Sequence, residues 1–203
     1  MWTQLLEGLV TREEENNIED QTLYINILSM LCRDHNEEGV RVYQIECLKE
    51  ILQSNNKIAL DFGTDNENGP YFRFPKKSEK TIQGFFSRNP RLGKFARTGA
   101  NPTDINNVVF YLVDLSKNHQ DTLFYIKYVC AVLNLYANMC LSRYRNAVKL
   151  IKEKGLRYDH IYEALYNPNV HYKFKESYFF IARVLLIDID PYFSVLKTRN
   201  RCY

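Results

Sequence analysis

The sequence lacks the features of a membrane-spanning or secreted protein. No run approaches the roughly 18 apolar residues that a membrane-spanning helix needs. The first residues, MWTQLLEGLVTREEE, have no basic region and no small-residue cleavage site, so they do not resemble a secretory signal. The five cysteines are scattered and form no Cys-x-x-Cys pair, which favours reduced thiols facing the cytosol. We therefore expect a soluble chain without a transmembrane segment.

Residue patterns for catalysis and for metal or cofactor binding are also missing. The sequence has no Gly-rich phosphate loop and no Gly-x-Ser-x-Gly elbow, and its four histidines share no ligand spacing. DFG at residues 61–63 lacks the other kinase motifs, and DNENG at 65–69 is typical of a turn, because Lys76 stands where a calcium loop needs an acid. DID at 188–190 lies at an expected helix end. We expect no enzyme activity, no cofactor and no metal site.

Composition and charge indicate a soluble globular chain with an uneven charge distribution. Of 203 residues, 45% are hydrophobic and 25% charged, which suits one domain over residues 1–203. Residues 1–70 carry a balance of −9, residues 71–99 a balance of +7, and residues 100–203 a balance of +5. The middle segment is therefore expected to attract acidic partners or the acidic first third of the same chain.

Helical spacing dominates both ends of the chain but fails in the middle. Leucines follow Trp2 at helical intervals, QTLYINILSMLCR follows an acidic stretch that favours a helix start, and another stripe comprises Ile45, Leu48, Ile51 and Leu52. Residues 54–103 hold five of the eight glycines and four of the six prolines. This composition predicts a long irregular insertion, with residue types compatible with short strands at KIALDF and YFRF.

The second half of the chain predicts further helices with short connections. PTDINNVVFYLVDL is expected to be one helix capped by Thr103, and YRNAVKLIKEK, YDHIYEALY and FKESYFFIARVLLI end at Gly155, NPN and DIDP. Between them, DTLFYIKYVCAVLNLYANMCL is apolar on nearly every side, which indicates a buried helix. Asn134 in this helix is expected to satisfy a buried backbone group or an adjacent helix end.

The basic insertion is the one segment whose composition suits binding. Its cations alternate with phenylalanines, a combination that suits single-stranded nucleic acid or anionic lipid. The alternative is a solvated segment that docks onto the acidic helices of residues 1–70, and we favour that reading. The candidate interaction patch comprises Lys76, Lys77, Arg88, Arg91, Lys94 and Arg97.

In LNLYANMCLSRYRNAV, KFKESYFFIARVLLIDIDP and, more weakly, ILSMLCRDHNEEGVRVYQ, the chain resembles inositol trisphosphate receptors, the intracellular calcium-release channels. LNLYANMCLSRYRNAV resembles the family pattern YQLNLFARMCLDRQYLAI, and KFKESYFFIARVLLIDIDP is similar to DLRASFCRLMLHMHVDRDP, although Ile189 replaces an arginine. ILSMLCRDHNEEGVRVYQ is a weaker match. Ryanodine receptors share the domain type. The matching positions that we assign to the scaffold are Leu133, Asn134, Leu135, Met139, Cys140, Arg143, Asp188 and Asp190.

The resemblance implies a fold and a function. The fold would be all-α, an armadillo-like helical solenoid or bundle of the type found in the cytoplasmic part of these receptors, interrupted by the 54–103 insertion. The function would be that of a non-catalytic scaffold that helps couple ligand binding to gating. Its partners would be other domains and subunits of a homotetrameric channel at the cytoplasmic side of the endoplasmic reticulum, with no direct inositol trisphosphate contact and no nucleic acid. The alternative is a stand-alone cytosolic helical-repeat adaptor that binds an acidic protein, RNA or anionic lipid through the insertion.

Overall fold

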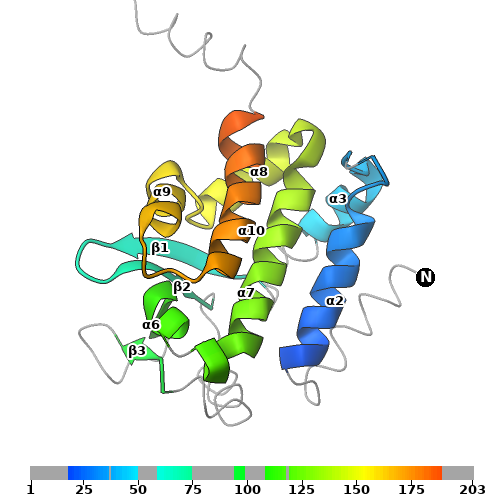
Figure 1. The fold of residues 1–203 in the computed structure, drawn as a ribbon. Helices are drawn as coiled ribbons and strands as arrows, with labels where there is room; N and C mark the ends of the chain where they lie inside the picture. Colours follow the sequence, from blue (N-terminus) through cyan, green and yellow to red (C-terminus); the bar gives the residue numbers. More distant parts are fainter. Residues whose placement is uncertain are drawn as a thin grey trace, which may run out of the picture.

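The chain folds as a mixed α and β structure. The computed structural model describes residues 18–36, 38–49, 59–74, 94–98, 108–117 and 119–188. Within these residues, helices pack against a four-stranded antiparallel sheet that lies at one side of the molecule (Figure 1). The expected all-α, armadillo-like fold is therefore wrong, because part of the segment that we interpreted as an irregular insertion forms a paired sheet.

The helices match the sequence periodicity over most of their length. A 3-10 turn, η4 (Leu141–Arg143), follows α7, and a π-helical turn, η5 (Arg183–Ile187), continues α10. The helix that we expected to end at Gly155 and the one expected to end at NPN do end there. The described helices are α2 (Ile18–Leu31), α3 (Arg41–Cys47), α6 (Leu112–Lys117), α7 (His119–Cys140), α8 (Arg145–Glu153), α9 (Tyr158–Tyr166) and α10 (Tyr172–Ala182).

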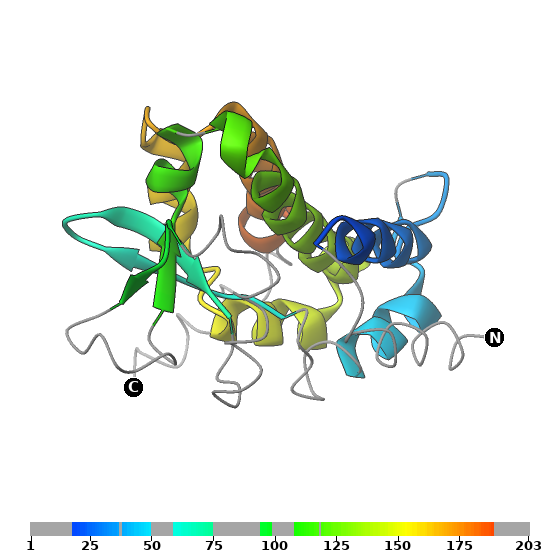
Figure 2. The same ribbon diagram turned by 90° about the horizontal axis from the view of Figure 1, so that it is seen from below.

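The helix α7 is the central element of the fold. Figure 1 shows α2 and α10 on either side of it, and both helices pack against it. Seen from below, α3, α8 and the sheet form a second layer behind these three helices (Figure 2). Leu133, Tyr136 and Met139 are completely buried, which confirms the prediction of a buried helix. Full burial of each such side chain contributes about 1.5–3 kcal/mol to folding.

The sheet is built from strands that carry aromatic side chains. Its order is β1-β2-β4-β3, and the strands are β1 (Asp61–Asp65), β2 (Gly69–Arg73), β3 (Arg97–Thr98) and β4 (Val108–Tyr111). Phe72 pairs with Phe62 on one side and with Phe110 on the other, so three phenylalanines share one face. The Phe72 and Phe110 rings stack at 5.2 Å, and Phe62 meets Tyr136 of α7 edge to face. This row of rings joins the sheet to the central helix.

Two predictions about this region have different outcomes. The strands suggested by KIALDF and YFRF exist, since β1 begins at Asp61 and β2 includes Tyr71–Arg73. The single helix expected over PTDINNVVFYLVDL is wrong: its middle forms β4, and a helix begins only at Leu112, while Thr103 lies outside the described residues. Val-Val-Phe-Tyr has strong strand propensity, and pairing with β2 decides between the two patterns.

Tight turns fix the ends of these elements. DNENG is the β1–β2 turn, as expected, with the Asp65 carboxylate accepting hydrogen bonds from the Glu67 and Asn68 amides. These bonds, led by that from Glu67, hold the pKa of Asp65 below its usual value. Gly155 has a φ of +91°, and a Cβ there would lie 1.8 Å from the carbonyl oxygen of Phe62. Only glycine fits where the α8–α9 connection meets β1.

Candidate functional site

The residues that carry the sequence resemblance gather on α7 and in the turn that follows it. Leu133, Leu135 and Met139 are completely buried, and Cys140 is 1% exposed. Burial raises the pKa of the Cys140 thiol, so this cysteine is a packing residue and a poor nucleophile. The apolar part of the motif therefore builds the core.

The asparagine that forms hydrogen bonds with a neighbouring helix is Asn138, one helical turn after Asn134, for which we predicted this role. Asn134 is only partly buried and lines a groove between α2 and α10. It is Asn138, 3% exposed, whose amide nitrogen donates to the Ser29 carbonyl at 3.1 Å and to the Ser29 hydroxyl at 2.7 Å. The expected role of Asn134 thus belongs to Asn138. Both lie on the same face of α7, four residues apart, and we singled out only Asn134 from the sequence.

The C-terminal end of α7 is capped by residues from the start of α3. The buried amide of Gln44 donates to the carbonyl oxygens of Asn138 and Leu141 at 2.9 and 3.1 Å. The last carbonyls of a helix have no partner within the helix, so these bonds satisfy two of them. The Gly39 amide donates to the Ser142 hydroxyl, and the Arg41 guanidinium donates to the Ser142 carbonyl. Gln44 ends the weakest of the three matching stretches, but its role was not predicted, because a single glutamine in an amphipathic helix has no distinguishing sequence signal.

The charged residues of the resemblance lie at the surface. Arg143 is exposed in η4 and has a φ of +57°, a conformation that lets the chain turn from α7 into α8. The Asp188 carboxylate lies 3.6 Å from the guanidinium of Arg183 at the end of η5. Asp190 lies outside the described residues. The two described charges lie at helix ends, and Asp188 pairs with Arg183.

Two residues of the predicted basic patch, Lys94 and Arg97, belong to the described part of the chain. Lys76, Lys77, Arg88 and Arg91 lie outside the described residues, and Lys94 is exposed. The guanidinium of Arg97 contacts the Asp114 carboxylate at 2.6 Å and the Asn68 side chain at 2.9 Å, over the Tyr111 ring. Arg97 therefore ties β3 to α6 and to the β1–β2 turn.

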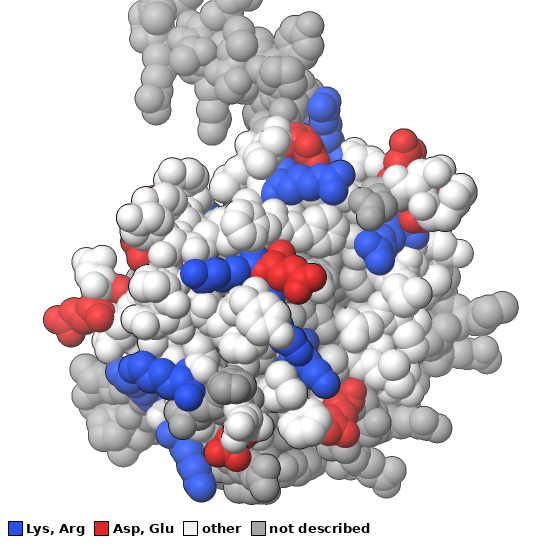
Figure 3. Space-filling model, in the orientation of Figure 1, with Lys and Arg blue, Asp and Glu red and all other residues white. Residues whose placement is uncertain are grey.

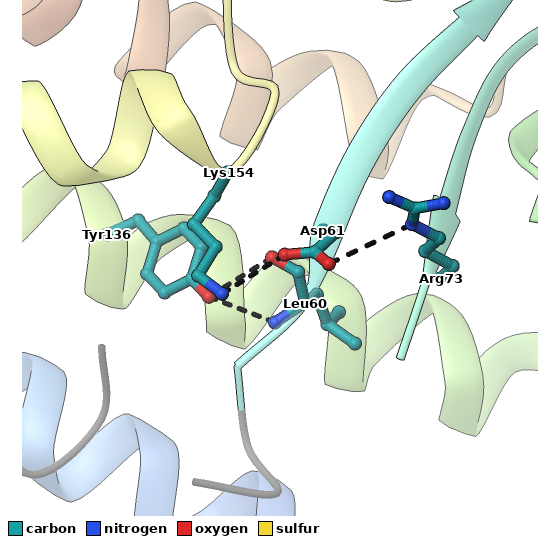
Figure 4. Close-up of polar contacts among 5 residues, drawn as sticks. All are labelled: Leu60, Asp61, Arg73, Tyr136 and Lys154. Carbon is teal, nitrogen blue, oxygen red and sulfur yellow. Dashed lines mark hydrogen bonds and ion pairs between the residues drawn. The ribbon is translucent and has the colours of Figure 1, made fainter. Parts of the chain in front are cut away.

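A second polar cluster joins the sheet to α7 and α8. Asp61 lies between Lys154, at 3.1 Å, and Arg73, at 3.8 Å (Figure 4). The Tyr136 hydroxyl accepts from the Leu60 amide at 3.0 Å and donates to its carbonyl at 3.3 Å. The Phe62 amide also donates to the Lys154 carbonyl at 2.7 Å. The aspartate of DFG is thus an ion-pairing residue at a structural junction.

One buried histidine links three elements of the fold. Nδ1 of His160 in α9 lies 2.8 Å from the Gly63 carbonyl in β1, and Nε2 lies 2.7 Å from the Tyr178 hydroxyl in α10. A carbonyl only accepts, so Nδ1 carries the proton and Nε2 accepts from tyrosine. Burial lowers the pKa of His160 to about 4. No residue spacing marked this histidine, although the neighbouring Ile161 and Ala164 indicate that it lies on the buried face of α9.

Two cysteines, one directly after α2 and one at the end of α3, lie next to each other in the core. The sulfurs of Cys32 and Cys47 are 3.5 Å apart, and both side chains are fully buried thiols. The contact with Cys47 and burial raise the pKa of Cys32. A neutral, inaccessible thiol reacts slowly, so this pair serves packing here.

The described residues contain a long apolar helix and no metal-binding cluster. Gln120–Arg143 is long and apolar enough to cross a membrane by length and composition, and 72% of its most apolar window is buried inside the fold. A core helix of a globular protein has these properties too. Within the parts of the chain that the structure describes, no three His, Cys, Asp or Glu side chains come together to hold a metal ion.

Neither a protein-family model nor a curated protein sequence matches the chain. The similarity to inositol trisphosphate receptors therefore stays a prediction from the residues themselves.

Proposed function

We propose that this chain is a non-catalytic scaffold module of an intracellular calcium-release channel of the inositol trisphosphate receptor type, and that it helps couple ligand binding to gating. The observation that supports the proposal best is the pair of hydrogen bonds that Gln44 forms with the end of α7. Gln44 is joined to carbonyls 94 and 97 residues further along the chain, within the segment that resembles the family pattern. The proposal depends on these residues and does not require an armadillo architecture.

The central helix is suited to transmitting movement. Its 22 residues span about 33 Å. It packs against α2, α3, α6, α8 and α10. A buried helix held on all these sides moves with its neighbours as one body, because close-packed interiors shift between discrete arrangements and deform little. A displacement applied to α2 or α10 would therefore reach the α3 end of α7.

The partners under this proposal are other domains and subunits of a homotetrameric channel at the cytoplasmic face of the endoplasmic reticulum. Such neighbours would contact the exposed faces of the outer helices. Figure 3 shows one of these faces, over α10, α7 and α2, where most side chains are uncharged and charges of both signs are scattered. Interfaces between protein domains have this mixed character more often than nucleic-acid sites, which concentrate positive charge.

The native polypeptide that contains this sequence provides the test. An antibody raised against α9–α10 should detect it in the microsomal fraction, in a detergent-solubilised complex several times larger than the polypeptide itself. The immunoprecipitate should bind radiolabelled inositol trisphosphate. A polypeptide of about the 24.1 kDa of this chain that stays in the cytosol would contradict the proposal and favour the stand-alone adaptor.

Coupling itself can be measured with one substitution. In the receptor, Gln44→Leu should leave inositol trisphosphate binding intact and reduce evoked calcium release, because it cuts the link between α3 and α7 without touching a ligand. Lys49→Met, on the exposed side of the turn after α3, is the matched control and should change neither. Equal release from the Gln44→Leu receptor and the wild type would refute the proposed coupling role.

A further inference from the structure

The outer face of α9 carries an exposed row of stacked tyrosines. Tyr158, Tyr162 and Tyr166 follow one another at intervals of four residues, so they lie on one side of the helix. Their rings are nearly parallel, with centroids 5.9 and 5.4 Å apart and interplanar angles of 17° and 9°. They are 61%, 46% and 74% exposed. Contiguous exposed aromatic surface of this kind marks an interaction site more often than isolated residues do.

An acidic row runs beside the tyrosine row. Asp159 and Glu163 lie one turn apart, next to the rings, and neither forms an ion pair with another described residue. Like charges at this spacing repel each other and cost a few tenths of a kcal/mol in a free helix. The helix contains no lysine or arginine, since its sequence is YDHIYEALY and His160 is buried and neutral. Arg97 and Lys117 line the groove that Glu163 borders, but Arg97 pairs with Asp114 and neither forms an ion pair with Glu163. This face therefore still fits a positively charged partner.

We infer that this face of α9 binds the C-terminal segment of the same chain, Lys197–Arg201. Its sequence, KTRNR, places cations at alternate positions: Lys197, Arg199 and Arg201. In an extended chain such positions are about 6.6 Å apart and point to the same side. Successive tyrosines on α9 are about 6 Å apart along the helix axis. The three cations thus match the three tyrosine positions in spacing, and the carboxylates of Asp159 and Glu163 beside the row supply the opposite charge.

The segment can reach the face. The helices α9 and α10 pack against each other and are joined by a short connection, so they run antiparallel. The described chain ends at Asp188, just beyond α10, on the side where α9 begins. The nine steps from Asp188 to Lys197 span up to about 30 Å when extended. The segment can therefore fold back along α9, starting near Tyr158.

The contacts follow from side-chain chemistry. The tyrosine rings stack too closely to admit a guanidinium between them, so the arginines bind at the ring edges. Their methylene stems cover the edges of the tyrosines, and their guanidinium groups donate to the carboxylates of Asp159 and Glu163. Arginine suits this arrangement better than lysine because its planar fork pairs with a carboxylate through two bonds.

The chain carries a convenient reporter, because Cys202 directly follows Arg201. Cys32, Cys47 and Cys140 are buried, and burial raises the pKa of the half-buried Cys130 to about 11, so a maleimide at pH 7 labels Cys202 first. The labelling control is Cys202→Ser, which should take up almost no label. With a nitroxide at Cys202 of the full chain, we expect selective broadening of the backbone amide signals of α9 and little broadening in α2.

Charge reversal separates specific docking from general attraction. Asp159→Lys with Glu163→Lys should abolish the broadening, and so should Arg199→Glu with Arg201→Glu, which leaves the folded helices untouched. Combining the two pairs should restore it. The matched control is Glu19→Lys with Glu38→Lys, two exposed acids at the start of α2 and in the α2–α3 connection, and should leave the broadening unchanged.

Three results would overturn the inference. The first is no broadening of α9 in the intact chain at low salt. The second is broadening that survives both reversed pairs. The third is broadening that arises only in a mixture of isotope-labelled chains with separate spin-labelled chains, since the occupant would then be a second copy.

Discussion

Acidification between pH 7 and pH 5 should destabilise the protein through His160. This side chain is 3% exposed and neutral, with its ring proton on Nδ1 donated to Gly63 and its other nitrogen accepting from Tyr178. Burial lowers its pKa from 6.5 to about 4, while the Gly63 bond opposes that shift. An imidazolium there would be a buried charge with no carboxylate bonded to it. Folding therefore favours the neutral ring.

The sign and size of the effect follow from linkage. Between pH 6.5 and 4 the unfolded chain binds a proton that the folded chain does not, so the free energy of unfolding falls as pH falls. Each pKa unit corresponds to about 1.4 kcal/mol, so the whole shift changes the free energy of unfolding by about 3 kcal/mol. From pH 7.5 to pH 5 the expected loss is about 2 kcal/mol. Solvent screening does not reduce this figure appreciably, because the ring is buried.

Urea unfolding at a series of pH values measures this directly. The wild type should lose about 2 kcal/mol more than His160→Gln over that range, since the amide can hydrogen-bond but does not titrate. His35→Gln, at an exposed position, is the control and should keep the wild-type slope. The reasoning is refuted if His160→Gln and wild type have the same pH dependence, or if the His160 ring titrates near 6.5 in the folded protein by NMR.

Three further substitutions test the packing. Gly155→Ala should lower the free energy of unfolding in urea by more than about 2 kcal/mol, through its φ of +91° and the contact with Phe62. Gly69→Ala has a φ of +84° but only an ordinary contact, 3.5 Å from the Asn167 side chain, and should cost about 1 kcal/mol; equal losses would contradict the close contact. Leu133→Asp should prevent folding, because it buries an unpaired charge, and an unchanged thermal midpoint would contradict its placement. Gln44→Leu should cost about 1–3 kcal/mol and speed hydrogen exchange at the end of α7, with unchanged exchange as the contrary result.

The sequence predicted the helices well where one physical signal dominated. In α7, apolar residues recur on every side, and no strand of that length and pattern would bury them all. In α8 and α9, turn residues marked the ends, because Gly155 adopts a left-handed conformation and Asn167-Pro168 stops the helix. Local rules sufficed at these places because tertiary contacts agreed with them.

The sheet and the polar contacts could not be predicted in the same way, because the residues that form them are far apart in the sequence. Val108–Tyr111 fits a helix by spacing and a strand by residue type, and only pairing with β2 decides. Asn138 and Asn134 differ by one helical turn, so the position of Ser29 in α2 determines which one is bonded. Arg97 seemed free to bind a ligand until β3 placed it beside Asp114. None of these contacts leaves a trace in local composition.

The backbone bond between Phe62 and Lys154 has a consequence for the cooperativity of unfolding. It joins β1 to the connection between α8 and α9, so the β1–β2 hairpin cannot separate from the helices without breaking this bond. The β-layer and the helices should then melt as a single foldon, and the Phe62 amide should exchange with solvent only at the rate of global opening.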